Sequence, residues 1–496
     1  MLTISNNLSI EFYINDKYIL EMITPETLAL ELIREKLGLT GAKEPCGEGD
    51  CGGCTIALGS WKNNHFQYQA INSCILPASR LHGCHVITTE GLVCGQKLHL
   101  IQKEMLEQHA VQCGFCTAGI IMSIFCLFLN NPSPNKNAII NALSGNLCRC
   151  TGYKFINDAV LSISDKLKKD KKQFLNLLPA YASGIQHKLK KNSIEQLSPG
   201  KLQDLSVCKN YYIPHRLGEL FSSMNKLKGN FKIINGGTDL MVQGNIHDIW
   251  PEAFIDISQV PQLNFIKKNK NFITFGGSTT FGQLQASSVV KQKIPTFYKA
   301  IFQIASNQIR NVATPAGNIA NASPIADSVC VLLALGAKLL VLCKNSKRKI
   351  DLKDFYQDYK VTSLDVTKEI ISAIEVPNEQ GFCNFEKSSK RSALDIATVN
   401  SCINIIIGKN NIIKDCRLAF GGIAKFPILA VKTSDFLLGK KITKENIEEA
   451  ASIAVKEFAP ISDVRGSAEY RCILIQNHII KHFNTYAENH FAQDKK

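Results

Sequence analysis

The N-terminal segment alternates hydrophobic and polar positions with the period of two that is typical of half-buried β-strands. Residues 8–14 and 17–20 are predicted as two short strands that turn at Asn15-Asp16. Residues 27–37 then carry hydrophobic side chains at helical spacing. The pattern therefore predicts a strand hairpin followed by a helix, and after that helix the hydrophobic pattern gives way to glycines and cysteines.

A second region is predicted to be helical. Residues 118–129 are almost wholly apolar over the length of a helix, which ends at Asn130-Asn131-Pro132. Residues 136–143 offer another helix. If these two helices are antiparallel, the segments before the first and after the second meet at one end of the domain.

Cysteine spacing gives the first indication of chemistry. A C-x4-C-x2-C pattern is followed by a more distant cysteine, which is the spacing of plant-type [2Fe-2S] ferredoxins and differs from the paired C-x2-C motifs of a zinc ribbon. Four nearby glycines permit the positive φ angles of a loop wrapped around a cluster: Gly47, Gly49, Gly52 and Gly53. The pattern predicts a ferredoxin-like β-grasp domain in which a [2Fe-2S] cluster is bound by Cys46, Cys51, Cys54 and Cys74.

A second set of four cysteines surrounds the predicted helices. Its C-x2-C and C-x-C motifs would meet at one end of the helix pair, and four thiolates there suit either a [2Fe-2S] cluster or tetrahedral zinc. Buried free cysteines are the alternative for both sets. The ligands of this second site are predicted to be Cys113, Cys116, Cys148 and Cys150. The ten other cysteines, such as Cys84, Cys94, Cys126 and Cys330, have no ligand spacing and are expected to pack in the interior.

Composition narrows the class of protein. With 45% hydrophobic residues, no run of roughly 18 apolar residues and no leader pattern at the start, the chain reads as a soluble, cytoplasmic protein without a membrane span. Its net charge of +15 raises the alternative of nucleic-acid binding. The densest lysines, at 166–172 and 188–191, lie in a polar stretch that suits a solvated linker better than a binding face.

Two segments in the second half suggest a nucleotide ligand. Residues 232–240 form a short apolar strand that runs into Gly-Gly-Thr-Asp, where backbone N–H groups can face a diphosphate. Residues 313–327 are rich in small and amide side chains and precede an apolar helix at 329–335, which suits a loop packed on a polar ligand. Ordinary surface loops remain the alternative for each segment taken alone.

The motifs at 45–54, 112–119 and 145–153 are similar to the iron–sulfur portion of the xanthine dehydrogenase family. Residues 233–240 and 313–327 resemble its FAD domain, and residues 418–424 and 462–471 its C-terminal flavoprotein domain. The resemblance implies an α+β multidomain fold. Its parts are a plant-type β-grasp [2Fe-2S] ferredoxin domain at 1–88, a four-helix [2Fe-2S] domain at 89–165, a linker at 166–205, a two-lobed FAD domain of the vanillyl-alcohol-oxidase type at 206–378, and an α/β C-terminal flavoprotein domain at 379–485.

The same resemblance implies cofactor contacts. Gln112 matches a glutamine that contacts the pterin of a partner subunit. In the FAD part, Pro315 stands where a glycine is common in the family, and it removes one N–H from the phosphate loop. Ile304 replaces an aromatic residue that stacks on the flavin in some relatives. The implied roles are diphosphate binding by Ile233, Ile234, Asn235, Gly236, Gly237, Thr238, Asp239 and Leu240; phosphate or ribityl contacts by Thr314, Gly317 and Asn318; a contact on the far side of the cofactor by Asp327; positions flanking the flavin and adenine rings for Ile304 and Ile371; and a place near the isoalloxazine for Lys387.

The function that the resemblance implies is that of the small subunit of a xanthine dehydrogenase. Electrons from purine oxidation at a molybdopterin-containing partner subunit would pass the helical-domain cluster, the plant-type cluster and FAD, and reach NAD. The short remainder after residue 471 leaves no room for a molybdopterin domain, so we expect a separate partner, a hetero-oligomer, and no catalytic residue for purine oxidation in this chain. The alternatives are service to an aldehyde or nicotinate hydroxylase, oxygen or another carrier as acceptor, and, from another class, a zinc-stabilised nucleic-acid-binding protein.

Overall fold

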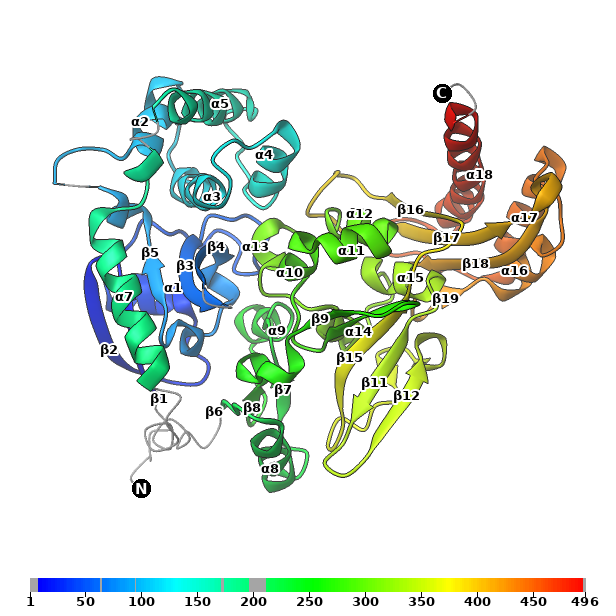
Figure 1. The fold of residues 1–496 in the computed structure, drawn as a ribbon, viewed down its shortest axis with the longest axis horizontal. Helices are drawn as coiled ribbons and strands as arrows, with labels where there is room; N and C mark the ends of the chain where they lie inside the picture. Colours follow the sequence, from blue (N-terminus) through cyan, green and yellow to red (C-terminus); the bar gives the residue numbers. More distant parts are fainter. Residues whose placement is uncertain (1–7, 63–64, 94, 171–173, 196–210, 494–496) are drawn as a thin grey trace. The chain divides into compact units, whose positions relative to one another are not determined.

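The computed structural model describes residues 8–62, 65–93, 95–170, 174–195 and 211–493, and the chain divides into two compact units (Figure 1). The first unit comprises residues 1–215, 230–259 and 305–313, and the second comprises residues 216–229, 260–304 and 314–496. Neither unit is one continuous stretch of chain, because both take segments from the region that was predicted as a single FAD domain.

The first unit begins with a β-grasp sheet. Strand β1 pairs antiparallel with β2 across a turn at Asn15, whose φ is 53°, and it pairs parallel with β5. The hydrophobic face of β1 packs on a short α1 and a π-helical turn, η1, in one core cluster. The strand order is β2-β1-β5-β3-β4, with the bounds β1 Leu8–Ile14, β2 Lys17–Ile23, α1 Ala29–Glu31, η1 Leu32–Lys36, β3 Thr55–Lys62, β4 His65–Asn72 and β5 His85–Ile87.

A helical layer follows within the same unit. Its core contains Ile124, Phe125 and Phe128 from the apolar helix α3, as the uninterrupted hydrophobic run predicts. The side chain of Asn135 caps the N-terminus of α4, where it accepts a hydrogen bond from the N–H of Ala138. Four helices make up this layer: α2 Leu100–Glu107, α3 Thr117–Asn130, α4 Lys136–Leu143 and α5 Lys154–Lys169.

The segment predicted as a linker contains a packed helix, α7 (Ala180–Glu195). Tyr181 donates to the carbonyl of Gly91 at 2.7 Å, and the carbonyl of Gln186 accepts from the indole of Trp61 at 3.1 Å. The ammonium groups of Lys188 and Lys190 lie over the rings of Tyr13 and Trp61, 5.8 Å and 5.0 Å from the ring centroids. These two lysines therefore contact aromatic side chains of the ferredoxin-like sheet. Residues 196–205 of the expected linker lie outside the described residues.

The rest of the first unit is a small parallel sheet. Hydrophobic residues of its strands and of helix α9, among them Tyr211, Ile234, Met241 and Phe254, share a core cluster with the ferredoxin-like sheet. The strand order is β6-β8-β7, and the elements are β6 Tyr211–Tyr212, β7 Lys232–Ile234, α9 Leu240–His247, β8 Phe254–Asp256 and the four-residue helix α13, Asn307–Arg310.

The second unit contains a five-stranded antiparallel sheet with helices. Apolar α15 is almost wholly buried, as its composition predicts. The sheet order is β12-β11-β15-β10-β9. Its strands are β9 Ile266–Lys268, β10 Phe272–Gly276, β11 Lys338–Leu342, β12 Lys347–Asp351 and β15 Ile370–Pro377, and its helices are α8 Leu217–Leu227, α10 Phe281–Ala286, α11 Ser288–Lys293, α12 Pro295–Ile301, α14 Pro315–Asn321 and α15 Asp327–Ala334.

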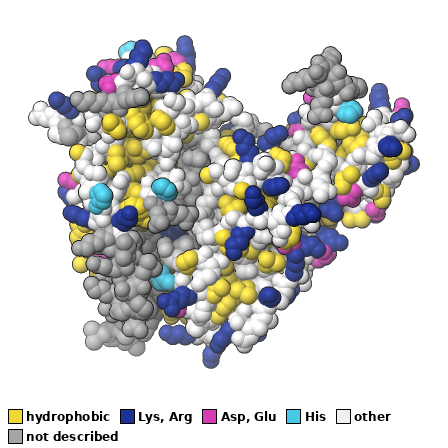
Figure 2. Space-filling model, in the orientation of Figure 1, with side chains coloured by type: hydrophobic (Ala, Val, Ile, Leu, Met, Phe, Trp, Pro, Cys, Tyr) yellow, Lys and Arg dark blue, Asp and Glu magenta, His cyan; other side chains and the backbone are white. Residues whose placement is uncertain are grey.

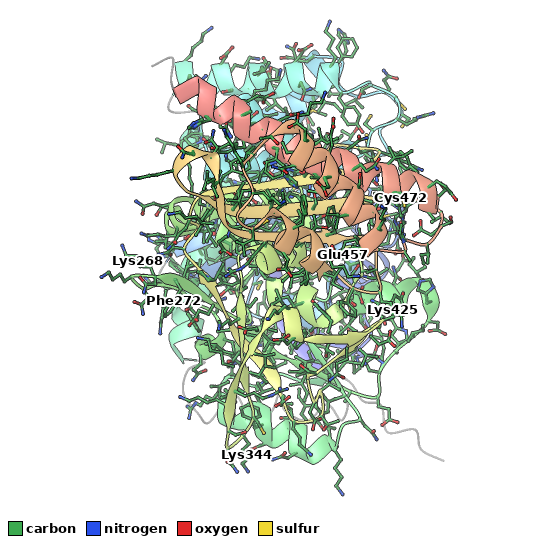
Figure 3. All side chains as sticks on the ribbon, turned by 90° about the vertical axis from the view of Figure 1, so that its right-hand side faces the viewer. Lys268, Phe272, Lys344, Lys425, Glu457 and Cys472 are labelled. Carbon is green, nitrogen blue, oxygen red and sulfur yellow. The ribbon has the colours of Figure 1, made fainter. Side chains whose placement is uncertain are left out.

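A four-stranded antiparallel sheet, β16-β17-β18-β19, forms the C-terminal part of this unit, with α15 packed on β17 and β18 and the long helix α18 on β16 and β17. The carboxylate of Glu457, labelled in Figure 3, accepts from the backbone N–H groups of Lys432 and Thr433 at the start of α16. The bounds are β16 Phe382–Ser388, β17 Val399–Ile407, β18 Ile413–Gly421, β19 Ile428–Leu429, α16 Val431–Leu437, α17 Lys444–Glu457 and α18 Ala468–Gln493.

The α+β multidomain architecture predicted from the sequence is thus confirmed, including a β-grasp sheet, a four-helix layer and a C-terminal part that mixes sheet and helices. Across the residues that the structure describes, no helix is long and apolar enough to cross a membrane. On the face drawn in Figure 2, the Lys and Arg side chains are interspersed with hydrophobic and acidic ones.

Candidate cofactor sites

Three cysteines of the first set lie in the loop between η1 and β3, and Cys74 lies just after β4. The Sγ atoms of Cys54 and Cys74 lie 3.3 Å apart, and Cys46 is hydrogen-bonded to Cys51 and Cys74. Hydrogen bonds from Cys51 and then Cys74 hold the pKa of the Cys46 thiol below its ordinary value, although burial acts in the opposite direction. The four predicted ligands are therefore gathered in one place.

Glycines give the loop its shape. Gly47, Gly49 and Gly52 have φ angles of 68°, 83° and 69°, in the region that side chains disfavour. The side chain of Asn72 donates to the carbonyl of Gly49 at 2.5 Å and fixes this turn from β4. Gly53 was expected to share this conformational role, but it is not among the glycines with positive φ.

The second cysteine set lies at one end of the helical layer, as predicted. Cys113 and Cys116 precede α3, and Cys148 and Cys150 precede α5. The Sγ atoms of Cys150 and Cys113 lie 3.7 Å apart, and Cys116 is hydrogen-bonded to Cys148. The hydroxyl of Thr151 donates to the Cys148 sulfur at 3.1 Å, which stabilises negative charge on that sulfur.

The sulfurs of each set contact one another. In the first set Cys46 is hydrogen-bonded to Cys51 and Cys74, and Cys74 also contacts Cys54. In the second set Cys113 contacts Cys150 and Cys116 contacts Cys148. Within the described part of the chain, no three His, Cys, Asp or Glu groups are placed to share one metal ion. A [2Fe-2S] cluster takes four cysteine thiolates, two on each iron, so two separate sets of four cysteines fit two such clusters.

The remaining cysteines are scattered. Cys126, Cys330, Cys402 and Cys416 are buried, whereas Cys84, Cys343, Cys383 and Cys472 are partly exposed. The interior role expected for these residues therefore applies to some of them only. Cys94 and Cys208 lie outside the described residues.

The predicted diphosphate loop connects β7 to α9 in the first unit. A Cβ on Gly236 would stand 2.3 Å from the carbonyl oxygen of Val312, and Gly237 has a φ of 71°, so both positions require glycine. Arg80, which forms an ion pair with Asp256, donates to the carbonyl of Asn235 at 2.9 Å and holds the loop in place.

This loop offers an unused donor. The side-chain nitrogen of Asn235 is buried and has no hydrogen-bond partner among the described residues. A buried donor without a partner is costly, and a phosphate oxygen of a nucleotide would satisfy it. The rest of the predicted segment is half-buried, apart from buried Ile234 and Gly237, and the side chain of Asp239 accepts from Gln243. These features fit the diphosphate of FAD.

The other predicted FAD contacts belong to the second unit. Thr314 caps α14, where its hydroxyl oxygen accepts from the N–H of Gly317 at 3.0 Å. Pro315 is the first residue of that helix, a position whose N–H has no partner within the helix, so its missing N–H costs α14 nothing. The side-chain oxygen of Asn318 accepts from Ser328 at 2.6 Å. Ile371 on β15 is buried and Ile304 is partly buried.

Asp327 and Lys387, predicted to contact different parts of the cofactor, are paired with each other. The ammonium of Lys387 lies 2.6 Å from one oxygen of Asp327 and donates to the carbonyl of Gln303 at 2.9 Å. Asn400 donates to the other oxygen of Asp327 at 2.6 Å. Burial raises the pKa of Asp327, and the charge of Lys387 opposes that rise. The Lys387 side chain is only 5% exposed, so its charge is held in the interior.

Sequence reasoning missed several residues that shape these sites. Asn400 lies opposite Lys387 in the β16–β17 register, and Arg80 reaches the diphosphate loop from a distant part of the chain. Gln308 lies buried beside the loop of the second cysteine set. No local pattern distinguishes these side chains from other polar residues, because their partners are remote in sequence.

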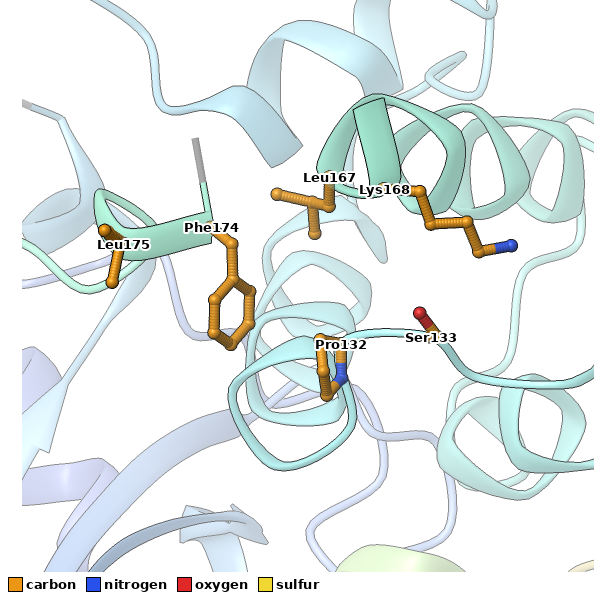
Figure 4. A pocket seen from close by; sticks show the side chains of 6 residues that line it. All are labelled: Pro132, Ser133, Leu167, Lys168, Phe174 and Leu175. Carbon is orange, nitrogen blue, oxygen red and sulfur yellow. The ribbon is translucent and has the colours of Figure 1, made fainter. Parts of the chain in front are cut away.

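A cavity of about 480 Å³ lies elsewhere in the helical layer, between the C-terminal ends of α3 and α5 (Figure 4). None of the predicted site residues lines it. The lining residues are Pro132, Ser133, Leu167, Lys168, Phe174 and Leu175.

Three protein-family models match the chain in the order of the predicted domains. Residues 88–161 match a [2Fe-2S] binding domain, residues 204–379 an FAD binding domain in molybdopterin dehydrogenase, and residues 385–486 a carbon monoxide dehydrogenase flavoprotein C-terminal domain. The chain is 30% identical to xanthine dehydrogenase from Emericella nidulans over 88% of its own length, and 30% identical to xanthine dehydrogenase/oxidase from Rattus norvegicus over 96%. The three family models and these relatives support a relationship with the xanthine dehydrogenase/molybdenum hydroxylase family.

The match covers one part of these molybdenum hydroxylases. The chain spans 35% of the Emericella protein and 39% of the Rattus protein. Among solved structures, a carbon monoxide dehydrogenase from Hydrogenophaga pseudoflava aligns with 55% of this chain and 96% of its own chain, with a TM-score of 0.53 and 26% identity. This chain therefore carries the [2Fe-2S] and FAD-binding domains of the molybdenum hydroxylase family.

Proposed function

We propose that this chain is the iron–sulfur/FAD subunit of a xanthine dehydrogenase, which receives electrons from a separate molybdopterin-containing subunit and delivers them to NAD. The observation that carries the proposal is the presence, in one chain, of two sets of four cysteines with sulfurs in contact and of a Gly-Gly loop after β7. When bound, the two clusters supply one-electron chemistry, and FAD couples it to the two-electron reduction of NAD. The chain's own residues bind these groups and fix their places.

Each cofactor has a proposed set of residues. The first cluster is held by Cys46, Cys51, Cys54 and Cys74, and the second by Cys113, Cys116, Cys148 and Cys150. Residues 233–240 hold the diphosphate of FAD, with Asn235 as a donor to it. Thr314, Gly317, Asn318, Asp327, Ile304, Ile371 and Lys387 complete the flavin site. The domain boundaries given above also stay predictions.

The surroundings of the second cysteine set support a partner subunit. Gln112, Cys113 and Cys150 are exposed, and so are four large side chains in the same loops and at the start of α5. Exposed apolar side chains next to a redox site are typical of a docking surface. Those four are Phe115, Leu147, Tyr153 and Phe155, which are 51%, 39%, 40% and 39% exposed. We propose that the molybdopterin subunit covers them and that its pterin contacts Gln112.

The test uses the chain produced with and without its candidate partner. The chain alone should reduce an artificial dye with NADH, and xanthine-dependent NAD reduction should require the partner. Cys116→Ser should abolish the xanthine reaction and leave NADH-dependent dye reduction near the wild-type rate, because electrons from NADH enter at FAD. Cys126→Ser, a buried cysteine outside both sets, is the matched control and should retain both activities. Xanthine oxidation by the chain alone would refute the proposed division of labour.

A second substrate class is favoured by the solved structures. The similarity to a carbon monoxide dehydrogenase at 26% identity supports the idea that the same electron-transfer scaffold serves other reactions. Assays of the complex with xanthine, aldehydes, nicotinate and carbon monoxide, run in parallel, decide which substrate class it oxidises. Turnover of one of these with none of xanthine would replace the purine assignment and leave the electron-transfer role intact.

A further inference from the structure

The short helix α13 is inserted among the elements that carry the two cysteine sets, all of them in the first unit. Asn311, which follows α13, donates to the carbonyl of Ala70 at the end of β4 at 2.9 Å. On the other side, the buried guanidinium of Arg310 donates to the side chain of Asn141 in α4. Gln308 and Arg310 are both fully buried although they are polar. Such a polar insertion needs specific partners, because an unpaired buried polar group is costly.

Gln308 reaches the loop of the second cysteine set. Its amide nitrogen donates to Ser123 and to the side-chain oxygen of Asn146, both at 2.9 Å. Ser123 also donates to that Asn146 oxygen, at 2.7 Å. With its oxygen held by two donors, the Asn146 amide nitrogen is directed at the carbonyl of Gly52 in the first cysteine loop, 3.1 Å away. Gln308 therefore orients the side chain that joins the two loops.

The backbones of the loops meet at the same place. The N–H of Leu147, the residue before Cys148, donates to the carbonyl of Cys51 at 2.9 Å. A ligand of the proposed first cluster is thus one hydrogen bond and one residue from a ligand of the proposed second cluster.

Three glycines allow this approach. A Cβ on Gly52 would stand 2.2 Å from the carbonyl oxygen of Gly145, and one on Gly119 would stand 2.0 Å from that of Gly52. A Cβ on Gly145 would stand 2.2 Å from the side-chain oxygen of Gln308. Any larger residue at these positions would push apart the loops or displace Gln308. The close contact is therefore built into the sequence at three separate positions.

We propose that Gln308 is a positioning residue for electron transfer between the two clusters, acting through Asn146 to hold the Cys51–Leu147 hydrogen bond. The inference rests on the proposed function. With both clusters bound, one electron would pass from one to the other, while Gln308, Asn146 and the Cys51–Leu147 hydrogen bond would keep their protons and no bond would be made or broken. A hydrogen-bonded backbone contact couples the two ligand sets better than an open gap, because tunnelling falls off steeply with distance through space.

The test replaces Gln308 by methionine, which has similar length and volume but no donor. In the cluster-loaded protein we expect Gln308→Met to retain wild-type iron content but to weaken the magnetic coupling between the two reduced clusters in electron paramagnetic resonance spectra. Exchange of the Leu147 amide hydrogen should accelerate by about tenfold, as expected for the loss of one net hydrogen bond. Electron equilibration between the clusters, followed after a rapid reducing pulse, should slow by a similar factor.

Asn311→Ala is the matched control. It removes an anchor from the same insertion, and Asn311 has no hydrogen bond to Asn146 among the described residues, so a merely structural role for α13 predicts equal effects of the two variants. Wild-type coupling and wild-type Leu147 exchange in Gln308→Met, or the same loss in Asn311→Ala, would overturn the inference. If Gln308→Met does not fold, the same results are read on Ser123→Ala, which removes the other donor to Asn146. Two cluster signals with unchanged coupling would refute only this role, whereas an absence of cluster signals in the unsubstituted protein would refute the proposed function.

Discussion

At the scale of single residues, the buried pair of Lys387 and Asp327 is the clearest electrostatic feature of the second unit. Both side chains are almost inaccessible, at 5% and 11% exposure, and both oxygens of Asp327 are hydrogen-bonded. A buried charge is tolerated only with such partners. The pair therefore places a fixed positive charge and a fixed negative charge next to each other in the region proposed to face the flavin.

We predict that Lys387→Met destabilises the protein by ~3–5 kcal/mol, because Asp327 is left buried without its partner. The comparison is Lys425→Met, which removes a 2.7 Å pair with Asp358 whose side chains are 68% and 53% exposed. An exposed pair of this kind contributes little to stability, because solvent screens the two charges. Urea unfolding of both variants measures the difference. Equal small losses would show that the interior charge is compensated in another way.

At the scale of elements, the loop between β7 and α9 depends on backbone proximity. Gly236 faces the carbonyl of Val312 so closely that no side chain fits. The loop is also tied to Arg80 through the carbonyl of Asn235. Its shape is therefore set by two other segments of the first unit rather than by its own hydrogen bonds.

Gly236→Ala should lower the affinity for FAD by at least about tenfold. The added Cβ would clash with the carbonyl of Val312 and force the loop away from the position in which it is proposed to bind the diphosphate. Gly184→Ala is the control, since a Cβ at Gly184 in α7 meets no atom within 4 Å. Flavin fluorescence titration of the apoprotein gives both affinities. An unchanged affinity in Gly236→Ala would contradict the assignment of this loop to the diphosphate.

Helix α18 is joined to β16 and β17 by a directed chain of hydrogen bonds. The amide nitrogen of Asn384 donates to the Glu386 carboxylate, which fixes the amide orientation, and its second hydrogen is directed at Nδ1 of His482. His482 Nε2–H then donates to Ser401, and the Ser401 hydroxyl to Nδ1 of His478. Both imidazoles are therefore neutral in the folded chain. Burial lowers the pKa of His478 to about 4 and holds the pKa of His482 well below its ordinary value.

We predict that α18 loses stability in mild acid. The unfolded chain, in which each His has a pKa near 6.5, binds more protons than the folded one, so the stabilisation is complete above pH 6.5 and is lost as the pH falls toward 4. Between pH 6.5 and pH 5 the loss should be about 1.5 kcal/mol for His478 alone. Hydrogen exchange of α18, corrected for intrinsic rates, measures it. A double variant, His478→Gln with His482→Gln, that kept the wild-type pH dependence would contradict this origin.

At the scale of the whole molecule, the sequence predicted the features that are encoded in short local patterns. It did not predict the contacts between residues that are far apart in the chain. The cysteine spacing and the helices at 118–129 and 136–143 were predictable because they are written within short stretches of sequence. The pairing of Lys387 with Asp327 was not, because the residues are far apart and each has other plausible roles. The insertion of α13 was missed for the same reason. The linker prediction followed charge density alone and overlooked the packed helix α7.

The most direct test is the cofactor content of the anaerobically purified chain, with spectra of its reduced form. We predict about four irons, about four labile sulfides and about one FAD per chain, and two distinct paramagnetic signals. Cys54→Ser should remove one signal and Cys116→Ser the other, each with about half of the iron. Iron close to zero in the unsubstituted protein, or the loss of both signals in each variant, would contradict two independent [2Fe-2S] sites.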